Sequence, residues 1–216
     1  AFARSGPTAH YDWERVRQRG WQRLDLPTVY APFAHGGFPT PSGRCEFYSE
    51  RLAKMGLDPL PGYVPPHEGP TSNAALAARY PLAMISPPAR NFLNSTFVNV
   101  KSLRDSEGEP TLEIHPRDAE RRGIVDGATV RVFNDRGSVV LSAQVTERMV
   151  PGVVHSYESC AEYDPIGEPG ESTDRGGCVN LLSPSRFITP TSSGMANNSC
   201  LVQIEKWTAP AEQGVA

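Results

Sequence analysis

The stretch ATVRVFNDRGSVVLSAQVT, residues 128–146, decides the fold of this chain. Apolar and polar residues alternate through residues 128–134 and again through residues 138–146. This period of two is typical of half-buried β-strands. Between the two runs, the sequence Asn-Asp-Arg-Gly predicts a tight turn. The stretch therefore predicts a β-hairpin.

Further strands are predicted on both sides of this hairpin. Short apolar or alternating runs occupy residues 81–86, 111–115, 152–158 and 199–206. Pro116 and Gly123 frame one small helix after the second of these runs, and His115 is its expected cap. Six or so short strands around one small helix favour a closed β-barrel. The polar, Gly-rich residues 159–177 are a long excursion from it.

The residues before the barrel predict a small α+β segment. Residues 10–23 have the pattern of a helix that stops at Gly20, and Ser49 is a good cap for a second helix over residues 50–55. A short strand is predicted between them, over residues 44–48. Five prolines in residues 58–70 predict an extended connector. We therefore expect two parts, residues 1–70 and residues 71–216, the second being the barrel.

Composition excludes several classes of function. The 216-residue chain has a formal net charge of −3 and no basic run, which argues against a nucleic-acid surface. No apolar stretch reaches membrane-spanning length, so we expect a soluble chain without membrane insertion. A signal sequence is not evident, but the first residue is Ala rather than Met. A processed or excised segment is therefore expected, and the compartment, cytoplasmic or periplasmic, stays open.

Neither the cysteines nor the histidines form a recognisable metal motif. Cys45, Cys160, Cys178 and Cys200 lie far apart without a CxxC pair, so reduced thiols are expected rather than a zinc or iron–sulfur site. The histidines have no HExxH or similar spacing. The carboxylates show no pairing that suggests acid–base chemistry. We expect no catalytic residue and no metal ligand here, and an isolated chain that is colourless and metal-free.

Two polar loops are the candidate ligand-binding elements. The first follows the strand at residues 81–86, and the second is the tract at residues 179–206, rich in Ser, Thr and Asn. In that tract Arg186 is the only ionic side chain before Glu205. Neutral amides and hydroxyls offer donors and acceptors together, which suits a large uncharged heterocycle. If both loops hang from the same end of the barrel, they can converge on one ligand; the alternative is that both are ordinary surface loops.

The first loop also offers groups suited to a phosphate. Arg90 can bind a phosphate bidentately, and the backbone N–H groups of Ser95 and Thr96 could add to that contact. Asn73 lies in neither loop, so it is the expected neutral control position.

The second half of the chain resembles the C-terminal dinucleotide-binding domain of molybdopterin oxidoreductases, the dimethyl-sulfoxide-reductase superfamily. The matching motifs are PLAMIS (81–86), FLNSTF (92–97), LEIHPRDA (112–119), GIVDG (123–127), VPGVV (150–154) and VNLL (179–182). The first half, with GFPTPSGRCEF at residues 37–47, is similar to the segment that precedes this domain in the same catalytic subunits. Residues 1–70 would then belong to the preceding domain.

This resemblance implies a six-stranded double-psi barrel covering a bis(molybdopterin guanine dinucleotide) cofactor with molybdenum or tungsten. Position by position, it suggests cofactor-binding roles for Ser86, Arg90, Asn94, Ser95, Thr96, Asn180, Ser193 and Asn197. Asn94 and Asn180 are the first choices. This chain has Leu182-Ser183 where relatives often have Leu-Thr, and Asn197-Asn198 where many have an aromatic or small residue. Contacts around Asn197 are therefore less certain to carry over.

The family's cysteine cluster and metal-ligating residue lie in upstream domains. The resemblance therefore implies the C-terminal cofactor-binding part of an oxidoreductase, inactive alone. Its expected partners are the upstream domains and an iron–sulfur electron-transfer subunit. Two alternatives are a separate small subunit that completes a cofactor site and a non-catalytic adaptor barrel. Charge-poor, Asn-rich loops disfavour the adaptor, and the resemblance of residues 10–48 to part of a larger domain disfavours the subunit. Substrate, metal, electron partner and oligomeric state are not decided.

Overall fold

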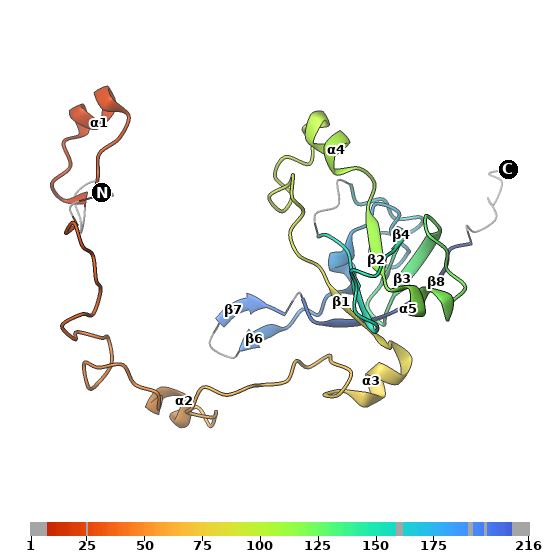
Figure 1. Cartoon of the computed structure of the whole chain (residues 1–216), viewed down its shortest axis with the longest axis horizontal. Helices are drawn as coiled ribbons and strands as arrows, with labels where there is room; N and C mark the ends of the chain where they lie inside the picture. The colour runs from red at the N-terminus through yellow and green to blue at the C-terminus, as the bar shows by residue number, and fades with distance from the viewer. Residues whose placement is uncertain (1–7, 25, 159–161, 190–191, 197, 209–216) are drawn as a thin grey trace. The chain divides into compact units, whose positions relative to one another are not determined.

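The computed structural model describes residues 8–24, 26–158, 162–189, 192–196 and 198–208. The chain divides into two compact units, Ala1–Tyr63 and Val64–Ala216. Each unit is described by itself below (Figure 1).

Six strands of the second unit form a closed barrel, in the order β1-β5-β2-β4-β3-β8. Neighbours β1–β5 and β2–β4 are parallel, and the other neighbours are antiparallel. The prediction of a closed six-stranded barrel is confirmed. The strands are β1 (Leu82–Ile85), β2 (Thr111–Ile114), β3 (Thr129–Phe133), β4 (Ser138–Val145), β5 (Val153–His155) and β8 (Cys200–Lys206).

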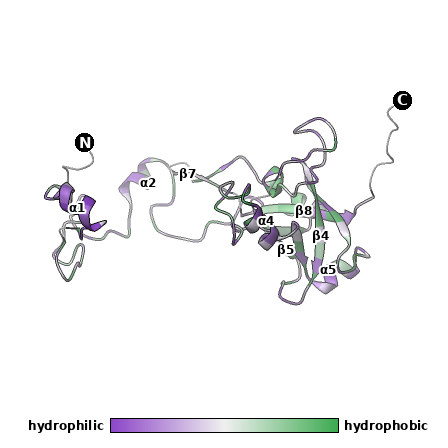
Figure 2. Cartoon of the chain, turned by 90° about the horizontal axis from the view of Figure 1, so that it is seen from above, coloured by the Kyte–Doolittle hydropathy of each residue, from purple (hydrophilic) through white to green (hydrophobic). Residues whose placement is uncertain are grey.

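The barrel interior is apolar. Leu112 and Ile114 of β2 are fully buried, as are Val130 and Val132 of β3. Their spacing of two residues is the alternation expected of strands with one face turned inward. Figure 2 shows the hydrophobic colour concentrated in the barrel. Burial of this apolar surface is the main force that holds the unit together.

Short helices lie around the barrel. α5 (Pro116–Glu120) begins after β2, and Nδ1 of His115 accepts the Arg117 N–H at 3.1 Å, which confirms the predicted cap. Two helices were not predicted from the sequence: α3 (Ala74–Arg79) and α4 (Lys101–Glu107). Asn73 caps α3, since its Oδ1 accepts the Leu76 N–H at 3.1 Å. Asn73 is therefore not the neutral position that the sequence suggested.

The tract at residues 179–206, which the sequence predicts as a loop before the last strand, contains further secondary structure. It contains the 3-10 turn η3 (Val179–Leu182) and a hairpin of β6 (Phe187–Thr189) and β7 (Ser192–Met195). The sequence analysis did not predict these elements. Phe187 and Ile188 are both exposed in the hairpin, so no inward-facing alternation marks it as a strand.

The first unit contains helices and loops. α1 (Trp13–Arg19) is capped by Asp12 and ends at Gly20, and α2 (Glu50–Lys54) is capped by Ser49, which confirms both predicted helices. The predicted strand at residues 44–48 is wrong, because the structure has bends there and no ladder. A strand needs a partner for its backbone groups, and the described residues of this unit supply none. The segment is therefore not α+β.

Residues 64–70 belong to the barrel unit. Glu68 accepts two hydrogen bonds from the Arg136 guanidinium, at 2.7 and 2.9 Å. The predicted boundary after residue 70 thus lies beyond the division that follows Tyr63. Glu68, within the Pro-rich stretch, binds this stretch to the β3–β4 turn through Arg136. The sequence of residues 58–70 has no hydrophobic periodicity from which this contact could be predicted. None of the helices described is both long and apolar enough to cross a membrane.

Candidate functional site

Three strand ends meet at one end of the barrel. β1 runs antiparallel to β8, with Met84 opposite Cys200, and parallel to β5, with Ile85 opposite His155. The loops that follow β1 and β5 and the tract that precedes β8 therefore leave the barrel together. We call this the loop end.

One hydrogen bond joins the two polar elements that the sequence singled out. The Ser86 N–H donates to Oδ1 of Asn198 at 2.9 Å. Ser86 directly follows β1 and is only 2% exposed, so the barrel fixes its position. Asn197, the neighbouring residue predicted to bind the cofactor, lies outside the described residues. The first loop and the last tract thus meet at the loop end.

Asn94, Ser95 and Thr96 of the first loop lie on an exposed turn, and Arg90 is exposed in the bend before it. Leu93 and Thr96 exchange backbone hydrogen bonds of 3.1 and 2.9 Å around Asn94 and Ser95. Asn94 has a φ of 51°, a left-handed conformation that Asn tolerates better than most residues. The Thr96 N–H donates to the Leu93 carbonyl within the turn, and its contact with a phosphate stays a prediction. Within the described chain, the side chains of Arg90, Asn94, Ser95 and Thr96 form no hydrogen bond.

Asn180 faces outward from η3. Its neighbours Val179 and Leu182 are 2% and 0% exposed and anchor the turn on the barrel core. The Asn180 side chain is exposed and bonds to no other described residue, while its carbonyl accepts the Ser183 N–H at 3.2 Å. Ser193 lies in β7, but its side chain is outside what the structure describes. The amide of Asn180 is therefore rigidly presented and available.

Asp174 organises this region, and the sequence analysis missed it. The residue is 0% exposed and lies in the excursion after β5. Its Oδ1 accepts the N–H groups of Asp164 and Gly176 at 2.7 and 3.1 Å, and its Oδ2 accepts that of Cys178 at 2.6 Å. Its backbone also pairs beside Val139 of β4. Asp174 therefore holds the excursion against the barrel directly before η3. The signal in the sequence was an Asp two residues before the pair Gly176-Gly177.

Arg136 is the second organising residue that sequence reasoning missed. Besides its ion pair with Glu68, its guanidinium donates to the Leu182 carbonyl from Nε at 2.9 Å and from Nη2 at 2.6 Å. Asn134 donates to the same carbonyl at 2.8 Å. The β3–β4 turn therefore holds the C-terminal end of η3, and with it Asn180.

The same turn is tied to the entrance of β1. Tyr80 donates its hydroxyl hydrogen to Oδ1 of Asp135 at 2.7 Å, and Arg79 forms an ion pair with that carboxylate. The hydrogen bond from Tyr80, and then that from Arg79, lower the pKa of Asp135 below its ordinary value. These contacts join the β3–β4 turn to the residues that precede β1.

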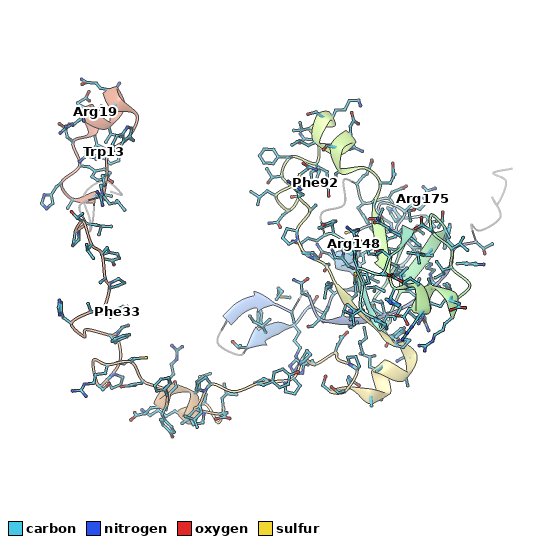
Figure 3. The ribbon with its side chains drawn as sticks, viewed as in Figure 1. Trp13, Arg19, Phe33, Phe92, Arg148 and Arg175 are labelled. Carbon is cyan, nitrogen blue, oxygen red and sulfur yellow. The ribbon has the colours of Figure 1, made fainter. Side chains whose placement is uncertain are left out.

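A cleft of about 1140 Å³ opens at the loop end. Phe92 of the first loop lines it, together with Tyr157, Asp164 and Arg175. Phe92 and Arg175 are labelled in Figure 3. The predicted site residues that the structure describes are not part of its lining. The cleft is a separate feature beside them, lined by charged and polar groups.

The three described cysteines differ in burial. Cys45 is exposed, Cys178 is partly buried and Cys200 is buried, while Cys160 lies outside the described residues. Burial raises the pKa of the Cys200 thiol to about 11. Within the described residues, no three His, Cys, Asp or Glu side chains are grouped as a metal site would require.

The fold defines the class as a closed six-stranded β-barrel, with neutral amides and hydroxyls on the loops at one end, where β-barrels commonly bind small molecules. Comparison with known proteins identifies the family. Residues 82–201 match the model of the molydopterin dinucleotide binding domain. The chain belongs to this family of molybdopterin dinucleotide-binding domains.

Individual relatives agree with the family. The chain is 43% identical over 189 residues to the pyrogallol hydroxytransferase large subunit of Pelobacter acidigallici, covering 79% of this chain and 22% of the relative. It is 39% identical over 177 residues to dimethyl sulfoxide reductase DmsA of Escherichia coli, covering 77% and 21%. The structure is similar to acetylene hydratase from Pelobacter acetylenicus, with a TM-score of 0.71, 25% identity, and coverage of 93% and 28%. The chain thus spans about a fifth of the length of these curated relatives.

Proposed function

We propose that this chain is the C-terminal cofactor-binding part of an oxidoreductase that carries bis(molybdopterin guanine dinucleotide) with molybdenum or tungsten. The family and the relatives support this proposal. The observation that carries it in the structure is the hydrogen bond between Ser86 and Asn198. It joins the two polar elements at one end of the barrel, where one ligand can contact both.

The groups at the loop end fit such a cofactor. A fused pterin ring has an edge of alternating donors and acceptors, and an Asn amide offers one of each. Asn180 presents its amide without a protein partner among the described residues, on a turn that Asp174 and Arg136 hold from both sides. Asn94 is presented on the turn of the first loop. We propose that both contact the pterin, with Arg90 directed to a phosphate.

The bound cofactor would supply the two-electron chemistry. The residues of this chain would bind it, orient it and exclude water from one side. The charged cleft beside the loop end would form part of the substrate path. The proposed partners are the other domains of the same catalytic subunit, as in the longer relatives, and an iron–sulfur electron-transfer subunit, which rests on the resemblance alone. No observation favours an adaptor barrel, and a cofactor domain agrees with the family.

The test replaces one amide at a time in the full-length protein. Asn180→Asp keeps the size of the side chain but replaces the amide donor with a charged acceptor. We expect it to weaken cofactor binding by about 1–3 kcal/mol. The measurement is molybdenum or tungsten and guanine nucleotide per polypeptide. Gln18→Glu, the same chemical change on the exposed face of α1, is the matched control. Full cofactor content in Asn180→Asp would contradict the proposed role of Asn180.

Asn94 needs a second variant because of its backbone conformation. Glycine adopts a positive φ without strain, so Asn94→Gly keeps the turn and removes only the amide. We expect Asn94→Gly and Asn94→Asp both to lower the cofactor content. If only Asn94→Asp has an effect, the added charge disturbs binding and the amide of Asn94 does not contact the pterin.

A further inference from the structure

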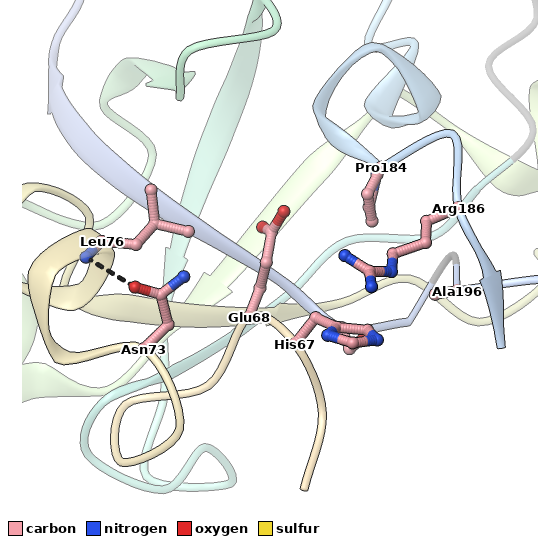
Figure 4. Close-up of a pocket in the computed structure, with 8 residues that line it drawn as sticks. His67, Glu68, Asn73, Leu76, Pro184, Arg186 and Ala196 are labelled. Carbon is pink, nitrogen blue, oxygen red and sulfur yellow. Dashed lines mark hydrogen bonds between the residues drawn. The ribbon is translucent and has the colours of Figure 1, made fainter. Parts of the chain in front are cut away.

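Pockets lie at both ends of the barrel. A pocket of about 270 Å³, drawn in Figure 4, reaches the loop end, since Ser199 of its lining directly precedes β8. A larger pocket, of about 490 Å³, lies at the opposite end, where the parallel strands β1 and β5 begin. Leu82, the first residue of β1, and Gly152, directly before β5, belong to its lining. We call it the distal pocket, and it is separate from the elements proposed to hold the cofactor.

Polar side chains reach the distal pocket from the end of α5 and from β8. Asp118 lies in α5, Arg121 and Arg122 directly follow this helix, and Gln203 belongs to β8. Gly123, with a φ of 62°, ends the turn that carries both arginines. The turn therefore fixes two positive charges beside the entrances of β1 and β5.

Arg122 and Gln203 give the pocket hydrogen-bond donors. The Arg122 guanidinium donates from Nε to Oε1 of Gln203 and from Nη1 to the Asp118 carbonyl, both at 3.0 Å. Both acceptors are uncharged, and desolvation lowers the pKa of Arg122 below its ordinary value, so its charge lacks full compensation. Oε1 of Gln203 also accepts the Ile204 N–H, which leaves its amide nitrogen to donate. A carboxylate would complement these groups.

Asp118 gives the same pocket a buried acceptor. Its side chain is only 4% exposed, and Oδ2 accepts the Gly152 N–H at 2.6 Å. Oδ1 accepts no hydrogen bond from the described residues, and Nη1 of Arg121, its ion-pair partner, is 3.8 Å away, too far for one. A buried carboxylate oxygen without a hydrogen bond is costly. A donor brought by a ligand would therefore stabilise Asp118.

Apolar groups complete the lining of the distal pocket. Leu82 and Ile204 are both 2% exposed and form part of the barrel core. Pro81 and Pro151 stand beside them and have no N–H to donate. These four residues offer an apolar surface to the body of a small ligand. The volume lies within the range of about 300–1,000 Å³ that is usual for small-molecule sites.

We propose that the distal pocket binds a small aliphatic α-amino acid. Its carboxylate would accept hydrogen bonds from Arg122 and Gln203, and its ammonium group would donate to Oδ1 of Asp118. Its aliphatic side chain would contact the two prolines. Asp118 repels an anion without a donor, and the arginines repel a cation without a carboxylate, so a ligand with both charges fits best. The proposal does not depend on the proposed function, because none of the groups assigned to the cofactor lines this pocket.

The test titrates the 216-residue chain with L-valine, isovalerate and L-valinamide. Isovalerate is valine without its ammonium group, and valinamide replaces the carboxylate by a neutral amide. NMR shifts of the Gly152 N–H and the Arg122 Nε–H measure binding, since these groups contact Asp118 and Gln203. We expect valine to bind at least about tenfold more tightly than either analogue, because each analogue loses a charge-assisted hydrogen bond. Equal affinity for all three compounds, or no saturable shift with valine, would overturn the proposal.

Asp118→Asn should reverse the preference between valine and isovalerate. The Asn oxygen can still accept the Gly152 N–H, while the amide nitrogen gives the pocket a donor in place of the free acceptor. We expect valine to bind about tenfold more weakly to Asp118→Asn, and isovalerate to bind more tightly than to the wild type. The ratio of the two affinities is measured within one variant, so it does not depend on the stability of that variant. An unchanged preference for valine would contradict the role of Asp118.

Arg122→Gln tests the carboxylate side of the site. It should weaken valine and isovalerate about tenfold and should not weaken valinamide, which has no carboxylate. Arg117→Gln, the same change at an exposed position of α5 outside the pocket, is the matched control and should bind valine like the wild type. Wild-type affinity for valine in Arg122→Gln, or an equal loss in Arg117→Gln, would overturn the proposal.

Discussion

The two units of the chain use their apolar side chains differently. In the barrel unit, strands turn residues such as Leu112 and Val130 inward, where they are fully buried. In the first unit, α1 and α2 bury none of their residues, and Trp21 and Phe47 are 69% and 77% exposed. In Figure 3, Trp13 and Phe33 project from a segment without a packed interior. The comparison teaches that the barrel carries its own stability, while the first unit needs a surface from elsewhere.

Thiol labelling should show the largest difference between the units. Cys45 is exposed in the first unit, and Cys200 is buried in β8 with a pKa raised to about 11. Labelling of Cys200 requires opening of the barrel, so we expect it to be at least about 1000-fold slower than labelling of Cys45 at pH 8. Peptide-resolved mass spectrometry measures both rates, and unfolding in urea should equalise them. Similar rates in the native chain would refute a closed barrel.

The Cys200 thiol also makes the stability of the barrel depend on pH. An ordinary thiol in the unfolded chain ionises near pH 8.5, whereas the folded value is about 11. Between these values the unfolded state binds fewer protons, so stability falls as the pH rises. Urea midpoints measured between pH 8 and pH 10 should fall in the wild type and fall less in Cys200→Ala. Parallel curves would show that Cys200 is not buried in this way.

Truncation of a leucine to alanine should lower the free energy of unfolding by several kcal/mol more in the barrel unit than in the first unit. Leu112→Ala should lower the free energy of unfolding by about 2–5 kcal/mol, because it removes buried methyl groups and leaves a cavity. Leu60, 53% exposed in the first unit, is the matched control, and Leu60→Ala should change stability by less than about 0.5 kcal/mol. Urea unfolding monitored by circular dichroism is the measurement. Equal losses of stability in Leu112→Ala and Leu60→Ala would contradict the inference that only the barrel unit has a packed core.

Asp174 tests whether the excursion belongs to the stable region. Asp174→Asn should cost about 1–3 kcal/mol, because an amide nitrogen replaces one of the oxygens that accept buried N–H groups. Asp164→Asn is the control, since that side chain makes only a half-exposed pair with Arg175.

The sequence predicts early proteolysis at residues 58–70 or 159–177, but the bonds of Asp174 argue for protection of the described residues after 162. Early cleavage there in the wild type would contradict this.

The smallest expected effect concerns the cap of α3. Asn73→Ala should cost about 1 kcal/mol, and Asn73→Asp should cost little, because Asp accepts the Leu76 N–H equally well. Thermal melting measures the difference between the two variants. Equal melting temperatures would show that α3 contributes nothing to the barrel unit.

The barrel could be predicted because its strands bury one face. The alternation of apolar and polar residues in residues 128–146 predicts which side chains face inward. Each of the six barrel strands has either this alternation or a short apolar run. All three residues of β6 are exposed, so this strand carried no such pattern. The strand predicted at residues 44–48 failed for a related reason, since local pattern cannot show whether a partner strand exists.

For the candidate site, the composition indicated two polar elements, and the structure joins these elements through Ser86 and Asn198. Their contact with a cofactor stays a prediction. The composition could not show that the Thr96 N–H donates within its own turn. Nor could it identify Asp174 or Arg136, since their partners are backbone groups and Glu68, whose proximity depends on closure of the barrel.

The position of β8 in the barrel has a consequence for the order of folding. β8 pairs with β1 on one side and β3 on the other, although it is the last of the six barrel strands along the chain. During synthesis, β1 and β3 must therefore wait with open edges until β8 emerges. Such distant pairings slow folding to milliseconds or seconds and leave strand edges open to aggregation. The loop end, which β8 completes, is thus among the last parts of the molecule to form, and a cofactor can be enclosed only after that step.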